Sequence, residues 1–496
     1  MSLWSCALLP LAVGLRAVTC GHVPVALTPV RSADASRQAA SDRGSSASQP
    51  SSAPWPGYWV EPEGGGFDSL YGRLQALHQR RTSRVRITIW GDSHVAGETF
   101  VAELRRRLQQ QLGDGGPGFV HLGRPFPSYR HLALRFGERG HWRSERVWSR
   151  YSRRHPQPRD DLLGPGGFTV LAPSSATAWL TPRSGSTRLA ALDLHFLRQP
   201  GGGKLEILAD GKRVKWLFTV ASGREPAFAA VDLPPGTRKL EFSTSHGEVR
   251  LFGVDLQSGE PGVVCDGLGI NGAKASIILD WNQSLLGDAL RRLGPDLLVL
   301  AYGSNEVDAE SLTPQKLAAT LDEAIRRLRR ATPQAACLLL GPPDQARYKR
   351  GTGWQLPAQL DLIIEEQRLA AARNGCAFFD QRRAMGGAGS IFAWTGADPP
   401  LALSDHVHLT GEGYRRLAGL LHRAIVDGWG HHLCRHAKPG VPCPAPGPTS
   451  APTSAPTSAP VSRRSPRTLS APPDRSARLT ARSTSLVRPP RTDLPD

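Results

Sequence analysis

A serine and a histidine loop at opposite ends of the sequence could together perform acyl transfer. The serine belongs to Gly91-Asp92-Ser93-His94, which follows an alternating strand pattern at 84–90. A serine that follows a parallel strand and opens a helix has its hydroxyl in the crevice where such sheets bind ligands. It would then be placed to attack a bound ester. Alone, a serine at this position more often serves only as a helix cap.

The block Asp405-His406-Val407-His408 could supply the base that this serine needs. An aspartate three residues before a histidine can accept a hydrogen bond from the imidazole Nδ1, which leaves Nε2 to take a proton from serine. This spacing favours Asp405 with His408, because Val407 between them can face the core. His406 is the competing candidate, and two surface histidines in a loop are the non-catalytic interpretation.

Two further blocks could stabilise the oxyanion that serine attack creates. They read Gly-Ile-Asn-Gly-Ala from Gly269 and Tyr-Gly-Ser-Asn-Glu from Tyr302, and each falls where a strand should end. A glycine N–H and an asparagine amide are suitable preorganised donors. We predict an oxyanion hole from the N–H groups of Ser93 and Gly272 and the side chain of Asn305, with Gly269 as the alternative to Gly272. Each block could instead be a plain turn, because Gly and Asn tolerate positive φ.

The segments that must position these blocks alternate strands with helices. Residues 296–301 and 336–340 are continuous apolar runs, as expected of strands buried on both faces of a parallel sheet. Capping and amphipathic patterns predict helices at 98–112, from Pro314 with Thr313 as N-cap, at 357–374 and at 411–427. The pattern predicts an α/β layered domain.

Between 168 and 256 the pattern changes to short β-rich runs. Seven strands are predicted, at 168–171, 189–197, 205–209, 213–219, 227–233, 239–243 and 248–256. Asp210-Gly211 indicates a hairpin, because a primed turn needs positive φ at both central residues. Seven short strands predict an all-β sandwich inserted into the α/β domain. Trp179 and Trp216 could stack on sugar rings there, although aromatic residues in a sandwich more often belong to the core.

The four blocks occur in the order found in SGNH (GDSL-type) hydrolases, and the sequence resembles that family. Ser93, Gly272, Asn305 and His408 match the four residues that name the family, and Asp405 matches the acid of its triad. The resemblance implies a three-layer αβα domain with a parallel sheet, a serine nucleophile, a histidine base and an oxyanion hole completed by Gly and Asn. It implies no metal and no cofactor.

Three further stretches, 339–344, 384–387 and 405–410, are similar to exported bacterial peptidoglycan O-acetylesterases. Members of that group carry a β-sandwich related to carbohydrate-binding modules between the serine and glycine blocks. The resemblance implies a serine esterase that removes O-acetyl groups from an O-acetylated polysaccharide of the cell envelope, with peptidoglycan as the expected substrate. The alternatives are a broader GDSL lipase or arylesterase, a sugar O-acetyltransferase, and a non-catalytic wall-binding protein.

The composition changes near both ends of the 496-residue chain. Residues 1–18 are mostly apolar but have no basic residue before the run, so they resemble an atypical signal peptide, and 17–20 faintly resembles a lipoprotein cleavage box. We expect export to the periplasm or cell envelope, with membrane anchoring through the N-terminus as an option. The expected organisation is 1–30 signal or anchor, 31–56 flexible linker, 57–115 and 258–430 hydrolase domain, 116–257 inserted β-sandwich and 431–496 disordered Pro/Ser/Thr/Arg-rich tail.

The net charge of +18 does not by itself indicate a nucleic-acid partner. No zinc-finger spacing, basic zipper or aromatic RNA-binding pattern accompanies it, so we expect no such partner. No apolar stretch reaches the roughly 20 residues of a membrane-spanning helix. The oligomeric state is not indicated.

The cysteines and the histidines near the tail give no metal-binding pattern. His431, His432, Cys434 and His436 fit no zinc spacing well, and a disulfide between Cys434 and Cys443 is the more economical interpretation. Three other cysteines lie in apolar contexts and are predicted to be buried thiols; they are Cys265, Cys337 and Cys376.

Overall fold

A parallel sheet forms the centre of the computed structural model, which describes residues 57–62, 65–147, 160–173, 175–185, 187–309 and 311–437. The segments 1–30 and 31–56 and the tail beyond 437 lie outside these ranges. The strand order of the sheet is β1 (Trp59–Val60), β19 (Ala377–Asp380), β16 (Ala336–Gly341), β15 (Leu297–Ala301), β2 (Arg84–Gly91) and β14 (Gly262–Gly269). Only β1 is antiparallel to its neighbour.

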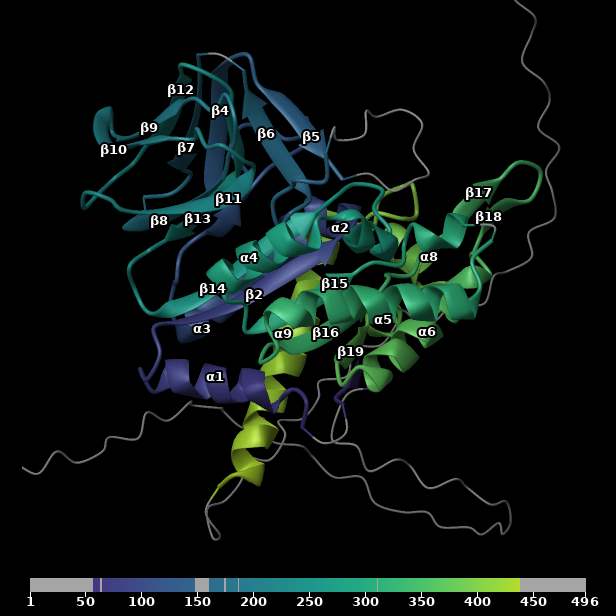
Figure 1. Cartoon of the computed structure of the whole chain (residues 1–496). Coiled ribbons are helices and arrows are strands. Elements are labelled where there is room, and N and C mark those ends of the chain that lie inside the picture. Colours follow the sequence, from purple (N-terminus) through teal and green to yellow (C-terminus); the bar gives the residue numbers. More distant parts are fainter. Residues whose placement is uncertain are drawn as a thin grey trace, which may run out of the picture. The chain divides into compact units, whose positions relative to one another are not determined.

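Helices cover both faces of this sheet (Figure 1). One layer holds α1 (Asp68–His78), α3 (Thr99–Leu112) and α9 (Gly411–Arg435), and the other holds α4 (Gln283–Leu293), α5 (Pro314–Ala331) and α6 (Gln359–Arg373). The short helical elements are α2 (Ser93–Ala96), α7 (Gln381–Met385), α8 (Ser390–Thr395), η1 (Ala275–Asp280) and η2 (Glu306–Asp308). The three-layer αβα prediction is therefore confirmed. None of the helices in the described ranges is long and apolar enough to cross a membrane.

The strands of the sheet separate two hydrophobic cores because their side chains alternate between its faces. Val85, Ile87 and Ile89 of β2 pack with the layer of α1, α3 and α9. Leu298 and Leu300 of β15 pack with the layer of α4, α5 and α6. The apolar runs predicted as buried strands thus supply both cores.

Local capping explains where two of the helices begin. The Thr313 side chain accepts a hydrogen bond from the Lys316 N–H, and Pro314 occupies the first turn of α5, as predicted. Thr410 caps α9 in the same way. α9 ends at Arg435, beyond the predicted 427, so the prediction of disorder from residue 431 is wrong for 431–435. Its last turn packs against α1 through Asp68, a contact that no local pattern indicates.

The inserted region forms two antiparallel sheets that enclose a third core. One sheet has the order β10 (Lys212–Phe218), β9 (Lys204–Ala209), β12 (Leu240–Ser245), β7 (Ala176–Pro182) and β4 (Leu134–Gly140). The other has the order β11 (Glu225–Asp232), β8 (Ala191–Arg198), β13 (Val249–Gln257), β6 (Phe168–Ala172) and β5 (Arg143–Arg146), with β3 (Gly118–Val120) paired to β13. All seven predicted strands are present, and the Asp210-Gly211 turn has positive φ at both residues.

A buried ion network joins the sandwich to the central sheet. Arg86 of β2 is 0 % exposed and donates to Asp266 of β14 at 2.7 Å and to Asp255 of β13 at 2.6 Å. Burial alone would raise the pKa of Asp255, but the guanidinium of Arg86 holds it below its ordinary value. Strands of the two parts are thus connected by charges as well as by the chain.

Two cysteine predictions need correction. Cys337 and Cys376 form a disulfide, because Cys337 lies in β16 and Cys376 immediately precedes β19, its parallel neighbour. The sequence shows only that both are apolar in context, not that they are adjacent. Cys265 is a buried thiol as predicted, and burial raises its pKa to about 12. Cys443, the proposed partner of Cys434, lies outside the described residues.

Trp216 is also not a core residue. Its side chain is 51 % exposed on β10, an edge strand, whereas Trp179 is half-buried against Gly137. The interpretation of Trp216 as core is therefore wrong, because the outward face of an edge strand has no sheet to cover it.

Candidate active site

The register of the central sheet brings three of the predicted blocks to one edge. Gly91, at the end of β2, pairs with Gly269 of β14 on one side and with Ala301 of β15 on the other. Each block follows directly after one of these strand ends. The residues after parallel strands therefore meet at the carboxyl edge, as predicted.

A tight turn after β2 presents Ser93. A Cβ on Gly91 would lie 2.4 Å from the Val95 side chain and 2.6 Å from the Ala301 carbonyl, so only glycine fits there. The Asp92 side chain then accepts a hydrogen bond from the His94 N–H at 2.9 Å and caps α2. Ser93 is therefore the first residue of α2, with its N–H in the first turn, where no intrahelical acceptor is available.

Ser93, His408 and Asp405 form a continuous hydrogen-bonded chain. Ser93 Oγ lies 2.9 Å from His408 Nε2, and His408 Nδ1 lies 2.7 Å from Asp405 Oδ2. The other oxygen of Asp405 accepts from the backbone N–H groups of Val407 and His408. Burial works against the charge of Asp405, but these hydrogen bonds outweigh it and hold the pKa of Asp405 below its ordinary value. A chain of this kind can move a proton from a serine to a histidine.

His406, the competing candidate for the base, contacts Thr395 and Trp354 instead of Ser93. Its Nδ1 lies 3.0 Å from Thr395 Oγ1, and its backbone has a positive φ of 52°. Its ring packs against Trp354. The geometry thus pairs His408, not His406, with Ser93.

The two glycine candidates for the oxyanion hole differ in their surroundings. A Cβ on Gly269 would lie 2.1 Å from the Ala96 nitrogen, so this glycine lets β14 pack closely against α2. Gly272 has a positive φ of 77°, is exposed, and has open space at its Cβ position. Within the described chain its N–H meets no acceptor. Gly272 is therefore the better candidate for a free donor.

Asn305 is tied to the same turn. Its Nδ2 donates to the Ala273 carbonyl at 2.9 Å, which uses one of the two amide hydrogens. The second hydrogen remains to be directed at a ligand. Asn305 thus combines a structural contact with a donor that the predicted role requires.

Glu306 is a residue that sequence reasoning did not assign to the site. It is buried, and its two carboxylate oxygens accept from the Ala275 N–H at 2.8 Å and the Gly303 N–H at 3.0 Å. It therefore holds the turn after β14 and the turn after β15 in a fixed relation. Burial raises the pKa of Glu306 despite these hydrogen bonds. Its place directly after Asn305 was the available signal.

His94 and Asp92 lie buried behind Ser93. The His94 ring centroid is 5.4 Å from that of His408, and its Nδ1 lies 2.9 Å from Tyr414 Oη. Burial, and then the proximity of His408, lower the pKa of His94 to about 3. A neutral His94 adds no positive charge beside His408, which favours proton uptake there. Burial likewise raises the pKa of Asp92 to about 7.

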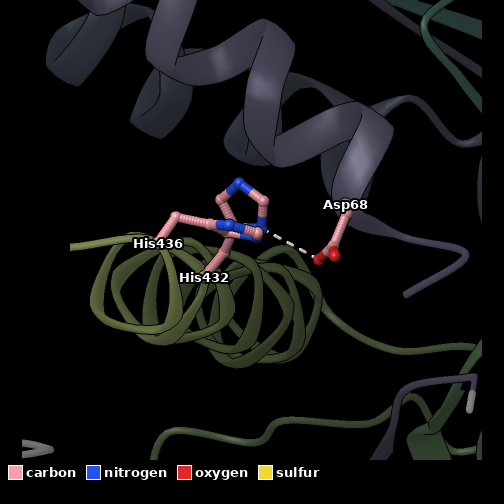
Figure 2. Close-up of side chains that lie close together, drawn as sticks. All are labelled: Asp68, His432 and His436. Carbon is pink, nitrogen blue, oxygen red and sulfur yellow. Dashed lines mark hydrogen bonds and ion pairs between the residues drawn. The ribbon is translucent and has the colours of Figure 1, made fainter. Parts of the chain in front are cut away.

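A separate polar cluster lies between α1 and the last turn of α9. Asp68, His432 and His436 place one ligand atom each within 4.8 Å of one another, and Figure 2 shows the two histidine rings facing the carboxylate from α9. Asp68 Oδ1 already accepts from His432 Nδ1 at 2.9 Å and from Arg435 at 2.8 Å. The cationic Arg435 competes with any metal, so we describe the cluster as a clamp between α1 and α9. His432 lies 21 residues after Gly411, or about 30 Å along α9 at 1.5 Å per residue.

Comparisons with known proteins agree with this architecture. Residues 236–416 match the model of the GDSL-like lipase/acylhydrolase family; this range includes four of the predicted site residues but not Ser93. A solved structure of a peptidoglycan O-acetylesterase is 25 % identical, with a TM-score of 0.64, and the alignment covers 77 % of this chain and 100 % of that one. No curated protein matches the sequence.

Two solved structures with lower identity match parts of the chain. A salicylyl-acyltransferase, SsfX3, from a tetracycline biosynthetic pathway is 14 % identical, with a TM-score of 0.29, and the match covers 60 % of this chain and 95 % of that one. A family two carbohydrate esterase from Clostridium thermocellum, in complex with cellohexaose, is 14 % identical, with a TM-score of 0.25 and coverages of 54 % and 97 %.

The layered fold and the GDSL-like domain at 236–416 indicate an esterase that is similar to SGNH (GDSL-type) hydrolases. Among the solved structures compared, the peptidoglycan O-acetylesterase is matched over its whole length.

Proposed function

We propose that this protein is a serine esterase that removes O-acetyl groups from a cell-envelope carbohydrate, with peptidoglycan as its substrate. The observation that carries the proposal is the hydrogen-bonded chain from Ser93 through His408 to Asp405. The relative with a TM-score of 0.64 is described as a peptidoglycan O-acetylesterase, which supports the substrate.

The reaction would begin when Ser93 Oγ attacks the acetyl carbonyl carbon and His408 Nε2 takes the hydroxyl proton. The carbonyl oxygen becomes an oxyanion, which the N–H groups of Ser93 and Gly272 and the Asn305 amide would stabilise. Asp405 would keep the Nδ1–H of His408 in place and stabilise the imidazolium. The C–O bond to the sugar then breaks, the sugar oxygen takes the proton from His408, and acetyl-Ser93 remains.

Water would complete the cycle at the same atoms. His408 takes a proton from water as the water oxygen attacks the acetyl carbonyl, and the same oxyanion donors act again. When the bond to Oγ breaks, Ser93 recovers its proton from His408 and acetate leaves. Each step needs only the side chains named and one water, so the proposal invokes no cofactor.

Solvent exposure of the loop supports a bulky substrate. The side chains of His408 and Asp405 are 38 % and 47 % exposed. A reacting loop that is this open can receive an ester held on a polymer, whereas a long acyl chain requires a covered apolar channel to offset its hydration. This favours the carbohydrate esterase over the broader lipase.

Export to the cell envelope belongs to the same proposal. The disulfide between Cys337 and Cys376 supports it, because such bonds persist mainly in oxidising compartments. Anchoring through the N-terminus remains a prediction for residues outside the described ranges.

The test is acetate release from O-acetylated peptidoglycan, measured beside hydrolysis of p-nitrophenyl esters of increasing acyl length. We expect wild type to release acetate and to prefer the acetyl ester, and Ser93→Ala to do neither while retaining its melting temperature. Hydrolysis of model esters without release from the wall would move the substrate elsewhere. A preference for long acyl chains would favour the broader lipase. Inactivity on every ester would favour the non-catalytic wall-binding protein.

A further inference from the structure

Exposed aromatic side chains gather beside the loop that carries His408. Tyr348 is 64 % exposed, Trp354 40 % and Phe392 38 %. We name these three residues, together with His406, the aromatic rim. Large apolar side chains that remain exposed together mark an interaction surface more often than those exposed singly.

Ring contacts hold the aromatic rim together around His406. Tyr348 and Trp354 are paired across the two-stranded hairpin of β17 (Arg347–Lys349) and β18 (Gly353–Gln355), with ring centroids 5.5 Å apart in an edge-to-face arrangement. The Trp354 ring is 4.2 Å from that of His406, and the Phe392 ring is 5.3 Å from it. Edge-to-face contacts leave ring faces uncovered, and a flat ring face is the surface on which the C–H face of a pyranose packs.

The hairpin is fixed to both loops of the candidate active site. The Ala346 N–H donates to the His406 carbonyl at 2.8 Å, two residues before His408. Arg347 donates to the Ser304 carbonyl at 3.2 Å, beside Asn305, and pairs with Asp308 at 3.1 Å. The hairpin that carries two residues of the aromatic rim is therefore attached to the loop of the base and to the loop of the oxyanion donor; its strands β17 and β18 are labelled in Figure 1. A group bound on the rim would thus lie against the same loop that carries His408.

The charge of the hairpin adds a second requirement for the ligand. Residues 345–356 include Arg347, Lys349 and Arg350 and no acidic residue. Arg347 is paired with Asp308, whereas Lys349 is the last residue of β17 and Arg350 begins the turn of the hairpin. A glycan that carries carboxylates matches this combination of aromatic faces and positive charge better than a neutral acyl chain does.

Folding alone does not account for the aromatic rim. An isolated two-stranded hairpin is at best marginally stable, so the contact between Tyr348 and Trp354 helps to stabilise this hairpin. This stabilising contact involves the edge of one ring and one face of the other. It does not involve Phe392, which lies on α8. Two separate elements thus present exposed aromatic rings to the same histidine.

We propose that the aromatic rim binds a pyranose ring of the carboxylate-bearing glycan whose acetyl ester is presented to Ser93. The inference rests on the proposed function and deepens it, because it names the surface that selects a sugar substrate. Trp354 is the central residue, since it contacts both Tyr348 and His406.

The test compares Trp354→Ala with Trp216→Ala, which removes a tryptophan of similar exposure from the sandwich. The substrates are soluble O-acetylated peptidoglycan fragments and p-nitrophenyl acetate, which has no sugar ring. For Trp354→Ala we expect the ratio of kcat/KM for fragments to kcat/KM for p-nitrophenyl acetate to fall about tenfold, mainly through KM. Trp354→Phe should restore most of the ratio, and Trp216→Ala should keep it at the wild-type value.

If the wild-type enzyme is active on the fragments, two outcomes would overturn the inference. Equal losses on both substrates would mean that Trp354 only supports the loop of His408. A loss of fragment turnover in Trp216→Ala but not in Trp354→Ala would move glycan binding to the sandwich. Far-UV circular dichroism and melting temperatures would show whether each variant is folded.

A binding measurement separates this inference from the proposed reaction. Fragments freed of acetyl groups by alkali are titrated into Ser93→Ala and into Ser93→Ala combined with Trp354→Ala. Weaker binding by the double variant would support the aromatic rim even if the wild type released no acetate. Equal binding by both proteins would overturn the inference whatever the wild type hydrolyses.

Discussion

Asp405 affects the reactivity of Ser93 without touching it. One of its oxygens contacts His408 Nδ1, and the other accepts two backbone N–H groups of the same loop. The carboxylate therefore fixes both the tautomer and the orientation of the imidazole. In the sequence, the spacing from Asp405 to His408 was sufficient to predict this contact.

We expect Asp405→Asn to lower kcat for p-nitrophenyl acetate by roughly 10³- to 10⁴-fold. An amide can hold the opposite tautomer, which places the proton on Nε2 and prevents that nitrogen from accepting one from Ser93. Because Asp405 acts through His408, adding Asp405→Asn to His408→Ala should cause little further loss. Steady-state kinetics of the three variants test this, and additive losses would contradict the assignment.

Glu306 is expected to act by positioning the two oxyanion turns. In Glu306→Gln, one acceptor oxygen becomes an NH₂ group that faces a backbone N–H, so one of the two turns is released. We expect kcat for p-nitrophenyl acetate to fall about tenfold or more, with little change in KM. Glu103→Gln, on α3, is the matched control. A wild-type kcat in Glu306→Gln would show that the turns keep their places without it.

Among the site residues, those in short motifs were predictable and those that support them were not. Ser93, Asn305, Asp405 and His408 are recognised by type and spacing, because the chemistry constrains both. Glu306 accepts from the backbone N–H groups of Ala275 and Gly303, and Tyr414 contacts the ring of His94. Nothing in the local sequence indicates these partners.

At the scale of elements, the buried strands β15 and β16 were predictable, whereas the edge strands β4 and β5 were not. β15 and β16 are continuous apolar runs that the sheet buries on both faces. β4 and β5 read Leu-Arg-Phe-Gly-Glu-Arg-Gly and Arg-Ser-Glu-Arg, with most side chains exposed or half-buried, and both escaped prediction. As edge strands they pair through the backbone, so their side chains need not be apolar.

The strand β8 contains a histidine whose titration should affect stability. His195 is buried between Phe119 and Phe228, and burial lowers its pKa to about 4 despite the nearby Asp193. In the unfolded chain its pKa is near 6.5. Between about pH 6.5 and pH 4, the unfolded state therefore binds a proton that the folded state does not bind. The free energy of unfolding decreases as the pH falls through this range.

We therefore expect His195→Leu to flatten the pH dependence of the free energy of unfolding. Between pH 7 and pH 5, wild type should lose about 2 kcal/mol more than the variant does. Urea unfolding at both pH values measures this difference. An identical pH dependence of the two proteins would mean that His195 has the same pKa in the folded and the unfolded state, which would contradict the effect of burial.

At the scale of the whole molecule, the sandwich and the hydrolase domain share a buried charge. Replacing Asp255 with Asn removes one of the two carboxylates that neutralise Arg86, which has no access to water. We expect the free energy of unfolding to fall by about 3 kcal/mol. Glu260→Gln, which breaks the exposed pair with Arg188, should cost less than about 1 kcal/mol. Similar losses in urea unfolding would contradict the role given to burial.

The architecture of the whole molecule was predictable because each level of the sequence indicated it separately. The alternation of strands and helices predicted the layered domain. The hairpin signal and the short β-rich runs predicted the sandwich, and their position between the serine block and the glycine block predicted that the sandwich is inserted into the layered domain. The disulfide between Cys337 and Cys376 was not predictable, since it depends on β16 and β19 being neighbours. Strand order in a parallel sheet is set by packing, and local patterns do not specify it.

The clamp between α1 and α9 joins two parts of the chain that are far apart in sequence. Asp68 of α1 binds His432 and Arg435 in the last turn of α9, which are 364 and 367 residues away. The clamp is about 30 Å along α9 from the start of that helix, which follows the loop of His408. The first and last helices of the domain therefore hold each other in place at a distance from the reacting groups, so a change at Asp68 would affect stability without touching the chemistry at Ser93.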